Sequence, residues 1–180
     1  ALPTGLDQAS AEGWSLTHAL EQWLGIEVTA TDARRLAGRF RFANLPTGAT
    51  LDDFDLDAAS GIDRSLLAEL GTCRYLETAT NVLLIGPPGV GKSHLAQAIG
   101  HEAIRAGFQV LYRSIFDLVR ELREEDNLPV GGKPLARYLK PDLLIVDDMG
   151  RKQLPPRSGE YLFEIIMRRY ENRSTLMTSN

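Results

Sequence analysis

The 180-residue sequence lacks the features that mark secreted and membrane proteins. Cys73 is the single cysteine, so an internal disulfide is excluded and a reducing compartment is expected. No apolar run is long enough to cross a membrane. Residues 1–5 have neither the basic region nor the apolar region of an export signal. We therefore expect a cytoplasmic protein without a membrane partner.

A strong positive charge, typical of many nucleic-acid-binding proteins, is also absent, because the net charge is −4. The charges are unevenly spread: residues 1–80 hold 12 acidic and 6 basic side chains, and residues 81–180 hold 12 and 14. A loose basic cluster in the second part could face phosphates or an acidic partner, although most charges of this kind are solvated surface. It consists of Lys133, Arg137, Lys140, Arg151, Lys152, Arg157, Arg168, Arg169 and Arg173.

One segment is far more specific. Residues 86–93 read GPPGVGKS and match the phosphate-loop pattern G-x-x-x-x-G-K-[ST]. Its glycines allow successive backbone N–H groups to point toward nucleotide phosphates. Lys92 would reach the β- and γ-phosphates, and the Ser93 hydroxyl would hold Mg²⁺. The residues predicted to bind the nucleotide here are Gly86, Pro87, Pro88, Gly89, Val90, Gly91, Lys92, Ser93 and His94.

The segments on either side give the phosphate loop the context that it requires. Residues 81–85 form a short apolar run, typical of a buried parallel strand. Residues 94–106 carry apolar side chains at helical spacing, and Gly107 is a suitable end for that helix. A Gly/Pro-rich surface turn would need neither the strand nor a lysine and serine at its end. We therefore interpret the segment as a nucleotide-binding strand–loop–helix unit.

The first fifty residues differ from the rest of the chain. We predict one helix over residues 15–24 and, after Gly25, a second helix over residues 31–43, capped by Thr31 and Asp32. These helices are too short to enclose a core of their own. Residues 1–46 are therefore predicted to be a small helical appendage, and residues 47–180 the nucleotide-binding core. The arginines of the second helix could touch DNA, but an exposed helical face explains them equally well.

Beyond residue 50, predicted strands and helices alternate along the chain. This alternation implies right-handed crossovers and an α/β fold, with a parallel sheet sandwiched by helices. The polar stretch over residues 124–132 is predicted to be a loop. The predicted helices of the core cover residues 62–78, 94–106, 114–124 and 158–172, and the predicted strands cover 81–85, 109–113, 143–146 and 176–179.

A second group of polar residues begins with Asp147 and Asp148, directly after a predicted buried strand. Because a buried carboxylate is costly unless it is paired or binds a metal, Mg²⁺ is the natural partner of Asp147, directly or through water. Asp148 would point to the other face of the strand and could orient or deprotonate the attacking water. Asn180 ends the last strand and could hydrogen-bond that water or the γ-phosphate, with Thr178 and Ser179 as rivals. The predicted catalytic residues are Lys92, Asp148 and Asn180, and the predicted metal ligands are Ser93 and Asp147.

With these residues in place, the chain resembles the AAA+ ATPases, in particular the clade of the replication initiator DnaA, the helicase loader DnaC and the transposition helper IstB. The resemblance runs from about residue 50 to residue 180, and the helical appendage is also similar to an IstB N-terminal region. In this family the segment ahead of the core packs by the adenine, which makes Phe54 a candidate nucleotide contact. The most specific matches are residues 50–55, 81–95, 142–150 and 168–180.

The resemblance implies a five-stranded sheet in the order 5-1-4-3-2, with ATP or ADP and Mg²⁺ as ligands. It also implies self-association into a nucleotide-dependent oligomer whose client is DNA or a DNA-bound protein. IstB-like members assemble on target DNA and recruit the transposase of their insertion element. We therefore expect an ATPase that serves as an assembly factor in DNA transposition, with duplex target DNA and a transposase as partners.

Two features depart from the family pattern. Most AAA+ proteins carry Asp-Glu where this chain has Asp147 and Asp148, and a side chain one methylene shorter puts the hydrolysis rate in question. The sequence also stops at Asn180, before the fifth strand, the arginine finger and the lid with its sensor 2 arginine. We therefore expect the C-terminal strand and lid to be missing, an unpaired sheet edge beside strand one, weakened nucleotide binding and little turnover.

Three other functions share the phosphate loop. A DnaC-like helicase loader would carry a different N-terminal extension that binds the helicase. A small-molecule or nucleoside kinase would place a substrate-binding Asp or Arg after strand two. Arg120 and Arg123 are available for that role, but the adjacent Asp147 and Asp148 argue against it. The third alternative is a nucleotide-dependent binding module that does not hydrolyse ATP.

Overall fold

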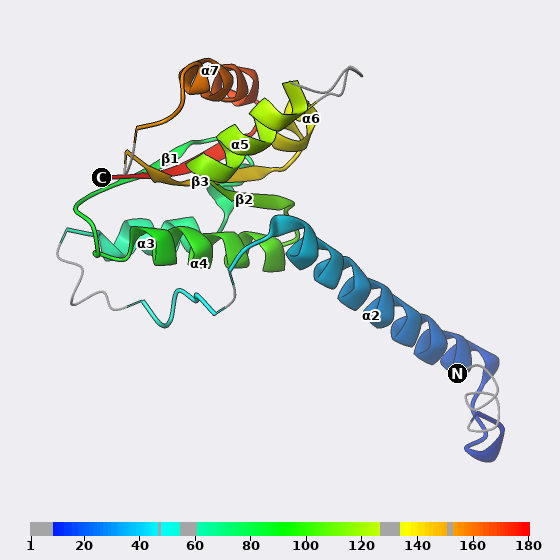
Figure 1. Cartoon of the computed structure of the whole chain (residues 1–180). Helices are drawn as coiled ribbons and strands as arrows, with labels where there is room; N and C mark the ends of the chain where they lie inside the picture. The colour runs from blue at the N-terminus through cyan, green and yellow to red at the C-terminus, as the bar shows by residue number, and fades with distance from the viewer. Residues whose placement is uncertain (1–8, 47, 55–60, 127–133, 151–152) are drawn as a thin grey trace. The chain divides into compact units, whose positions relative to one another are not determined.

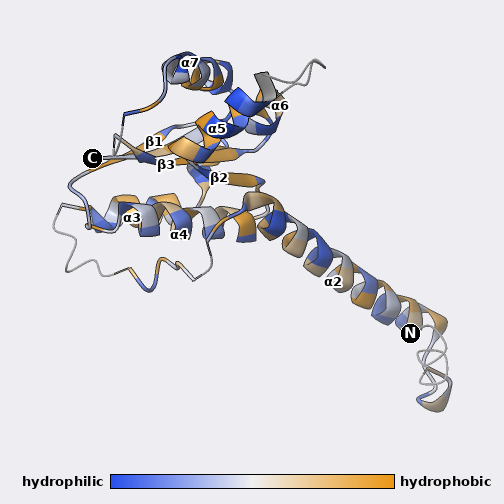
Figure 2. Cartoon of the chain, in the orientation of Figure 1, coloured by the Kyte–Doolittle hydropathy of each residue, from blue (hydrophilic) through white to orange (hydrophobic). Residues whose placement is uncertain are grey.

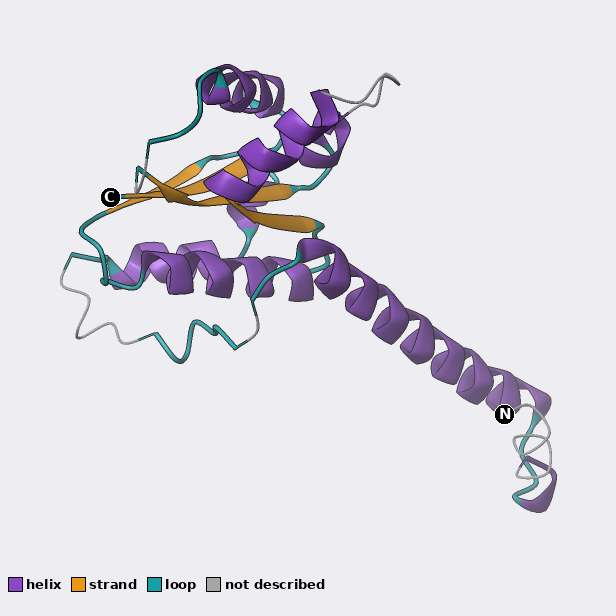
Figure 3. Cartoon of the chain, viewed as in Figure 1, coloured by secondary structure: helices purple, strands orange, loops and turns teal. Residues whose placement is uncertain are grey.

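Figure 3 shows the helices, strands and loops of the computed structural model. By its internal contacts the chain divides into two units, Ala1–Gly38 and Arg39–Asn180. The predicted boundary between residues 46 and 47 stays a prediction. No helix in the part of the chain that the structure describes is both long and apolar enough to span a membrane. The described residues are 9–46, 48–54, 61–126, 134–150 and 153–180.

Helix α2 (Leu16–Ala43) is continuous, so the prediction of two helices in this region is wrong. Gly25 lies inside the helix, where a glycine costs about 1 kcal/mol relative to alanine. Side chains of the next turns stabilise the helix beyond it. Thr31 was a predicted cap, but its hydroxyl donates to Glu27 Oε1 at 3.3 Å, and Arg34 donates to the same oxygen at 2.9 Å. These local bonds replace the predicted cap, and the helix runs through.

Four parallel strands form the sheet of the second unit, in the order β1-β4-β3-β2. Helices α3 and α4 lie on one face of the sheet, and α5, α6 and α7 lie on the other (Figure 1). This architecture confirms the predicted α/β fold, and the strand order agrees with the 1-4-3-2 part of the family sheet. The elements are β1 (Val82–Ile85), β2 (Val110–Ser114), β3 (Leu143–Met149), β4 (Ser174–Ser179), α3 (Arg64–Gly71), the 3₁₀ helix η1 (Arg74–Leu76), α4 (Lys92–Arg105), α5 (Ile115–Asp126), α6 (Pro134–Leu139) and α7 (Ser158–Arg169).

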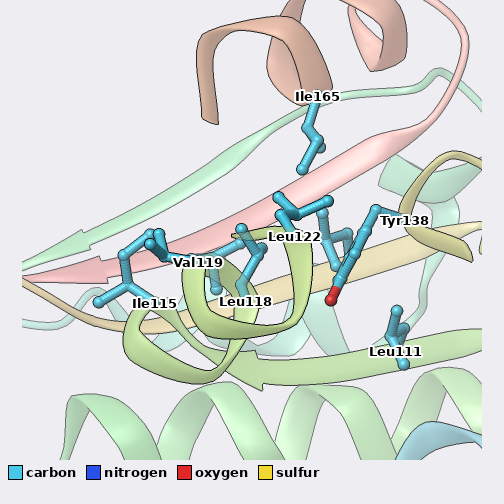
Figure 4. Close-up of a cluster of buried hydrophobic side chains, with 9 residues drawn as sticks. Leu111, Ile115, Leu118, Val119, Leu122, Tyr138 and Ile165 are labelled. Atoms are coloured by element: carbon cyan, nitrogen blue, oxygen red, sulfur yellow. The ribbon is translucent and has the colours of Figure 1, made fainter. Parts of the chain in front are cut away.

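A hydrophobic core fills the space between the sheet and helices α5, α6 and α7 (Figure 4). The first four residues of the central strand β3, LLIV, are all apolar (Figure 2), as expected for a parallel strand covered on both faces. Strand β3 is central, and its first four residues, 143–146, are fully buried. The cluster in this core consists of Leu111, Ile115, Leu118, Val119, Leu122, Tyr138, Leu144, Val146 and Ile165.

Three helix predictions need correction. The helix predicted over residues 62–78 is two pieces, α3 and η1, because Cys73 between them has a left-handed backbone with φ 59°. The helix predicted over residues 158–172 ends earlier, because α7 stops just before Tyr170, whose side chain is 55% exposed. Helix α5 continues to Asp126, into the predicted loop over residues 124–132, and the rest of that loop lies outside the described residues. Each helix end depends on local backbone geometry that apolar spacing does not encode.

Strand β1 lies at an edge of the sheet, where its partner among the described strands is β4. The prediction of a buried strand over residues 81–85 is therefore only half right. Leu83 is 53% exposed and Ile85 is 70% exposed, while the alternating Val82 and Leu84 are half-buried. An edge strand is covered less completely than a central one, so apolar composition alone overstates its burial.

Candidate nucleotide-binding site

The phosphate loop connects the end of β1 to the first turn of α4, as predicted for a strand–loop–helix unit. Gly89 and Gly91 adopt left-handed backbone conformations, with φ of 87° and 89°, which glycine tolerates and other residues rarely adopt. Lys92 Nζ donates hydrogen bonds to the carbonyl oxygens of Gly86 and Pro87 at 2.6 and 2.7 Å. The Lys92 ammonium group is therefore held against the phosphate loop, where it is predicted to bind nucleotide phosphates.

Asp147 connects the end of β3 to the phosphate loop. Ser93 Oγ donates to Asp147 Oδ1 at 2.9 Å, which joins residues 54 positions apart in the sequence. The Asp148 N–H donates to the same oxygen at 2.9 Å, and the Thr178 hydroxyl also donates to it. The Tyr112 hydroxyl donates to Oδ2 at 2.5 Å. The Asp147 residue is only 2% exposed, so these four hydrogen bonds offset the cost of burying its carboxylate.

A β-bulge at the end of β3 places Asp148. The register between β3 and β4 shifts between Val146 and Met149, and Asp148 has a left-handed backbone with φ 66°. The alternation of side chains between the two faces of a strand, from which the direction of the Asp148 side chain was predicted, is therefore interrupted. The Asp148 N–H also donates to Thr178 Oγ1, at 3.0 Å. Bulges commonly re-aim a side chain beside an active site, and here Asp148 borders the same cavity as the phosphate loop.

A cavity of about 280 Å³ brings together the phosphate loop and the ends of β3 and β4. Asn180 borders it, and its N–H donates to the Met149 carbonyl at 3.4 Å. Thr178, the rival to Asn180, borders the cavity as well. Gly86, Pro87 and Val90 line a second cavity, of about 520 Å³, beside α3 and β1. The residues around the first cavity are Pro88, Gly89, Gly91, Lys92, Ser93, His94, Asp148, Met149, Thr178 and Asn180.

Phe54 packs beside the phosphate loop. Its ring centroid lies 6.0 Å from that of His94, and a Cβ atom added to Gly91 would lie 2.9 Å from Phe54 Cε2. His94 Nε2 is buried and has no hydrogen-bond partner among the described residues. Buried polar atoms usually have a partner, so this nitrogen fits a polar group of a bound nucleotide. A role for Phe54 at the adenine remains a prediction.

Alanine at Gly91 is expected to destabilise the protein more than alanine at Gly89. Both positions have positive φ, so each substitution introduces backbone strain of about 1–3 kcal/mol. At Gly91 the new methyl group also meets the ring of Phe54, whereas a Cβ at Gly89 has nothing within 4 Å. The free energies of unfolding of the two variants, measured in urea, test this difference. Equal losses would contradict the packing of Phe54 on Gly91.

The described residues contain no group of three or more His, Cys, Asp and Glu side chains that could by itself hold a metal ion. Mg²⁺ is usually bound through one or two carboxylates together with substrate phosphates and water. Ser93 and Asp147 lie at the start of α4 and the end of β3, beside the loop that would hold those phosphates. The residues present therefore fit Mg²⁺ that arrives with a nucleotide.

Comparison with known proteins identifies the family. The model of the IstB-like ATP binding protein family matches residues 1–180. The chain belongs to this family. A protein of insertion sequence IS5376 from Geobacillus stearothermophilus, named for ATP binding, is 37% identical over 97% of this chain and 69% of its own length. An insertion-sequence protein of Sinorhizobium fredii, named in the same way, is 36% identical over 99% of this chain and 60% of its own length.

Solved structures place the IstB-like chain among AAA+ proteins with a phosphate loop. AMPPCP-bound DnaA from Aquifex aeolicus aligns with a TM-score of 0.60 and 27% identity, over 76% of this chain and 44% of the DnaA chain. The DnaC helicase loader aligns with a TM-score of 0.59 and 28% identity, over 78% of each chain. This chain therefore spans under half of that DnaA chain and about two thirds of its insertion-sequence relatives.

Sequence reasoning missed two polar residues of the IstB-like site. Gln97 Nε2, from α4, donates to the Tyr112 hydroxyl oxygen at 3.4 Å, and that hydroxyl donates to Asp147. Burial raises the pKa of Tyr112, and the hydrogen bond to Asp147 raises it further, so the phenol stays protonated at neutral pH. A tyrosine inside a strand is typical of ordinary packing. The one signal that could have identified Tyr112 was the pairing register of the predicted strands, because β2 pairs with β3 beside Asp147.

Most of the described members of the basic cluster are paired with acidic side chains or buried. Arg169 is 1% exposed, so its assignment to a charged surface is wrong. Four other members pair with acidic neighbours, and Lys133, Arg151 and Lys152 lie outside the described residues. The pairs are Arg137–Glu121, Arg157–Glu160, Arg168–Glu164 and Arg173–Asp142.

Proposed function

We propose that this IstB-like chain binds ATP with Mg²⁺ and hydrolyses it. The hydrogen bond of 2.9 Å from Ser93 to Asp147 carries the proposal, because it joins the phosphate loop to the carboxylates at the end of β3. Asp148 and Asn180 border the same cavity as Lys92. A phosphate-binding lysine, a metal-side carboxylate and groups able to orient water are the parts that ATP hydrolysis requires.

Each residue has a defined part in this proposal. Lys92 and the N–H groups of the loop would bind the phosphates, aided by the positive end of α4. Ser93 and Asp147 would hold Mg²⁺, which, when bound, neutralises charge on the β- and γ-phosphates. Asp148 would orient the attacking water or accept its proton, and Asn180 would hydrogen-bond that water or the γ-phosphate. Phe54 and His94 would flank the base.

Asparagine at position 148 is expected to lower single-turnover ATP hydrolysis by about 100-fold or more, because it removes the carboxylate that acts on water. The nucleotide Kd should stay within about threefold of the unchanged chain, since the phosphate contacts remain. Asparagine tolerates a left-handed backbone, so the φ of 66° at this position is retained. Phosphate release measured without any acceptor substrate provides the rate and also separates an ATPase from a kinase.

Glu171→Asn is the matched control for Asp148→Asn. Glu171 is an exposed carboxylate with φ 61°, so the control makes a similar change of charge at a similar backbone conformation outside the cavity. Its hydrolysis rate should equal that of the unchanged chain. Undiminished phosphate release by Asp148→Asn, or an equal loss in both variants, would refute the role of Asp148.

We further propose that the chain acts as a DNA-associated assembly factor, with duplex target DNA and a transposase as partners. Support comes from its membership of the IstB-like family and from relatives named as insertion-sequence proteins. A structure of DnaA bound to AMPPCP and single-stranded DNA aligns with a TM-score of 0.61 and 26% identity, over 76% of this chain and 43% of that chain. Two measurements test this proposal. One is ATP-dependent retention of the chain on duplex DNA, and the other is sedimentation of the chain, which detects self-association. Absence of DNA binding in every nucleotide state would exclude it.

Helicase loading is the second candidate, because the DnaC helicase loader aligns over 78% of this chain. A paired pull-down separates the two candidates. One arm uses the transposase of the element that encodes the chain, and the other uses the replicative helicase. Retention by the transposase alone supports transposition, and retention by the helicase alone supports loading.

A further inference from the structure

The orientation of the Asp147 carboxylate depends on groups outside the phosphate loop. Its Oδ1 atom accepts from Ser93, Thr178 and the Asp148 N–H. Its Oδ2 atom accepts from the Tyr112 hydroxyl at 2.5 Å. The Tyr112 hydroxyl is thus the donor that holds the second oxygen away from the loop.

A third residue extends this hydrogen bond into a chain. Gln97 Nε2 donates to the Tyr112 oxygen at 3.4 Å, which leaves the phenolic hydrogen for Asp147. Gln97 lies in α4, the helix that begins at the phosphate loop, and Tyr112 lies in β2. A chain of two hydrogen bonds therefore connects the helix after the loop, strand β2 and the carboxylate of strand β3.

We propose that Tyr112 is a positioning residue for the Mg²⁺ site, an inference that rests on the proposed nucleotide-binding function. Tyr112 is not among the residues that line the cavity. It acts through Asp147, whose Oδ1 stays directed at Ser93 while Oδ2 is bound to the phenol. Groups that hydrogen-bond to a metal-binding residue fix its orientation, and their loss typically lowers metal affinity about 10- to 100-fold.

Tyr112→Phe keeps the aromatic ring and removes the hydroxyl donor. Oδ2 then has no phenol to hold it, and rotation of the carboxylate disturbs the oxygen that faces Ser93. We expect the apparent Kd for Mg²⁺ to rise about tenfold. It is measured by titrating Mg²⁺ into the full chain with a fluorescent ADP analogue. In EDTA the affinity for the same analogue should change by less than about twofold, because no phosphate contact is altered.

Tyr138→Phe is the matched control. The Tyr138 hydroxyl donates to Glu121 Oε2 at 2.6 Å, in the core on the α5 and α6 side of the sheet. This control also loses a hydroxyl-to-carboxylate bond, but away from the site. Its Mg²⁺ titration should match that of the unchanged chain. Gln97→Leu is a second test variant, with a smaller shift expected in the direction of Tyr112→Phe.

The outcomes distinguish a failure of the positioning role of Tyr112 from a failure of the proposed nucleotide-binding function on which it rests. A raised Mg²⁺ midpoint in Tyr112→Phe, with unchanged affinity in EDTA, supports the positioning role. An unchanged Mg²⁺ midpoint, or an equal loss of affinity for the analogue with and without Mg²⁺, overturns the positioning role. Neither result contradicts nucleotide binding, which is the proposed function. Failure of the unchanged chain to bind the analogue overturns both. If Tyr112→Phe does not fold, Gln97→Leu decides, and an unchanged midpoint there overturns the inference.

Discussion

Replacing Lys92 with alanine is expected to weaken ATP and ADP binding about 100-fold or more. The ammonium group would bind the phosphates through charge-assisted hydrogen bonds, each contributing about 1.5–3 kcal/mol, and a 100-fold loss corresponds to about 2.7 kcal/mol. Lys92 already lies against the loop, with Nζ within 2.7 Å of the Gly86 and Pro87 carbonyl oxygens. Little rearrangement is therefore needed to present the charge to a ligand. Equilibrium titration with a fluorescent ADP analogue provides the measurement.

Lys140→Ala is the matched control for Lys92→Ala, because Lys140 is exposed and lies outside both cavities. Circular dichroism of the two variants shows whether the fold is retained. The control should bind nucleotide like the unchanged chain. A folded Lys92→Ala variant with affinity within threefold of the control would rule out phosphate binding at the loop.

The phosphate loop and the α/β fold could be predicted because their signals are local. The glycines, lysine and serine of residues 86–93 stand together, and strand-forming and helix-forming patterns alternate around them. Asp147 was recognisable because a charged residue directly after a buried strand needs a partner. Its hydrogen bond to Ser93 shows that the two motifs lie side by side. Close packing of these two segments follows from parallel strands whose carboxyl ends share one edge.

Other features depend on contacts that the sequence pattern does not contain. The bulge that turns Asp148 arises from the pairing register of β3 with β4. The role of Tyr112 depends on its register opposite Ile145, two residues before Asp147, and the sequence alone does not reveal that pairing. The continuity of α2 through Gly25 depends on side-chain bonds such as Arg34 to Glu27. In each case a specific tertiary or side-chain contact outweighed the local preference.

Arg169 is the clearest case of a charged residue whose structural role the sequence alone does not reveal. It follows Arg168 at the end of α7, and only the first of the two is exposed. Its guanidinium group donates to backbone carbonyl oxygens at the end of α6 and before β3, and to the start of β4. Burial lowers the pKa of Arg169 to about 10, so the group remains charged at neutral pH. The acceptors are the carbonyl oxygens of Tyr138, Leu139, Pro141, Asp142 and Ser174, together with Thr175 Oγ1.

Methionine at position 169 is expected to lower the free energy of unfolding by about 3–5 kcal/mol. The variant keeps much of the apolar stem but leaves several buried carbonyl oxygens without a donor, and each unsatisfied group costs about 1–3 kcal/mol unless it finds another partner. The loss would be a large part of the total, since domains of this kind are stable by about 5–15 kcal/mol. Urea denaturation followed by circular dichroism measures it.

Arg168→Met separates the loss of this buried network from the loss of an arginine in general. Arg168 Nη2 lies 2.6 Å from Glu164 Oε1, but the two side chains are 56% and 42% exposed, so the variant should lose less than about 1 kcal/mol. A loss below 1 kcal/mol in Arg169→Met, or equal losses in the two variants, would show that the carbonyl oxygens around Arg169 find other donors. A large loss confined to Arg169→Met would establish that one buried cation holds the end of α6 and the start of β4 together, and so supports the strand that ends just before Asn180.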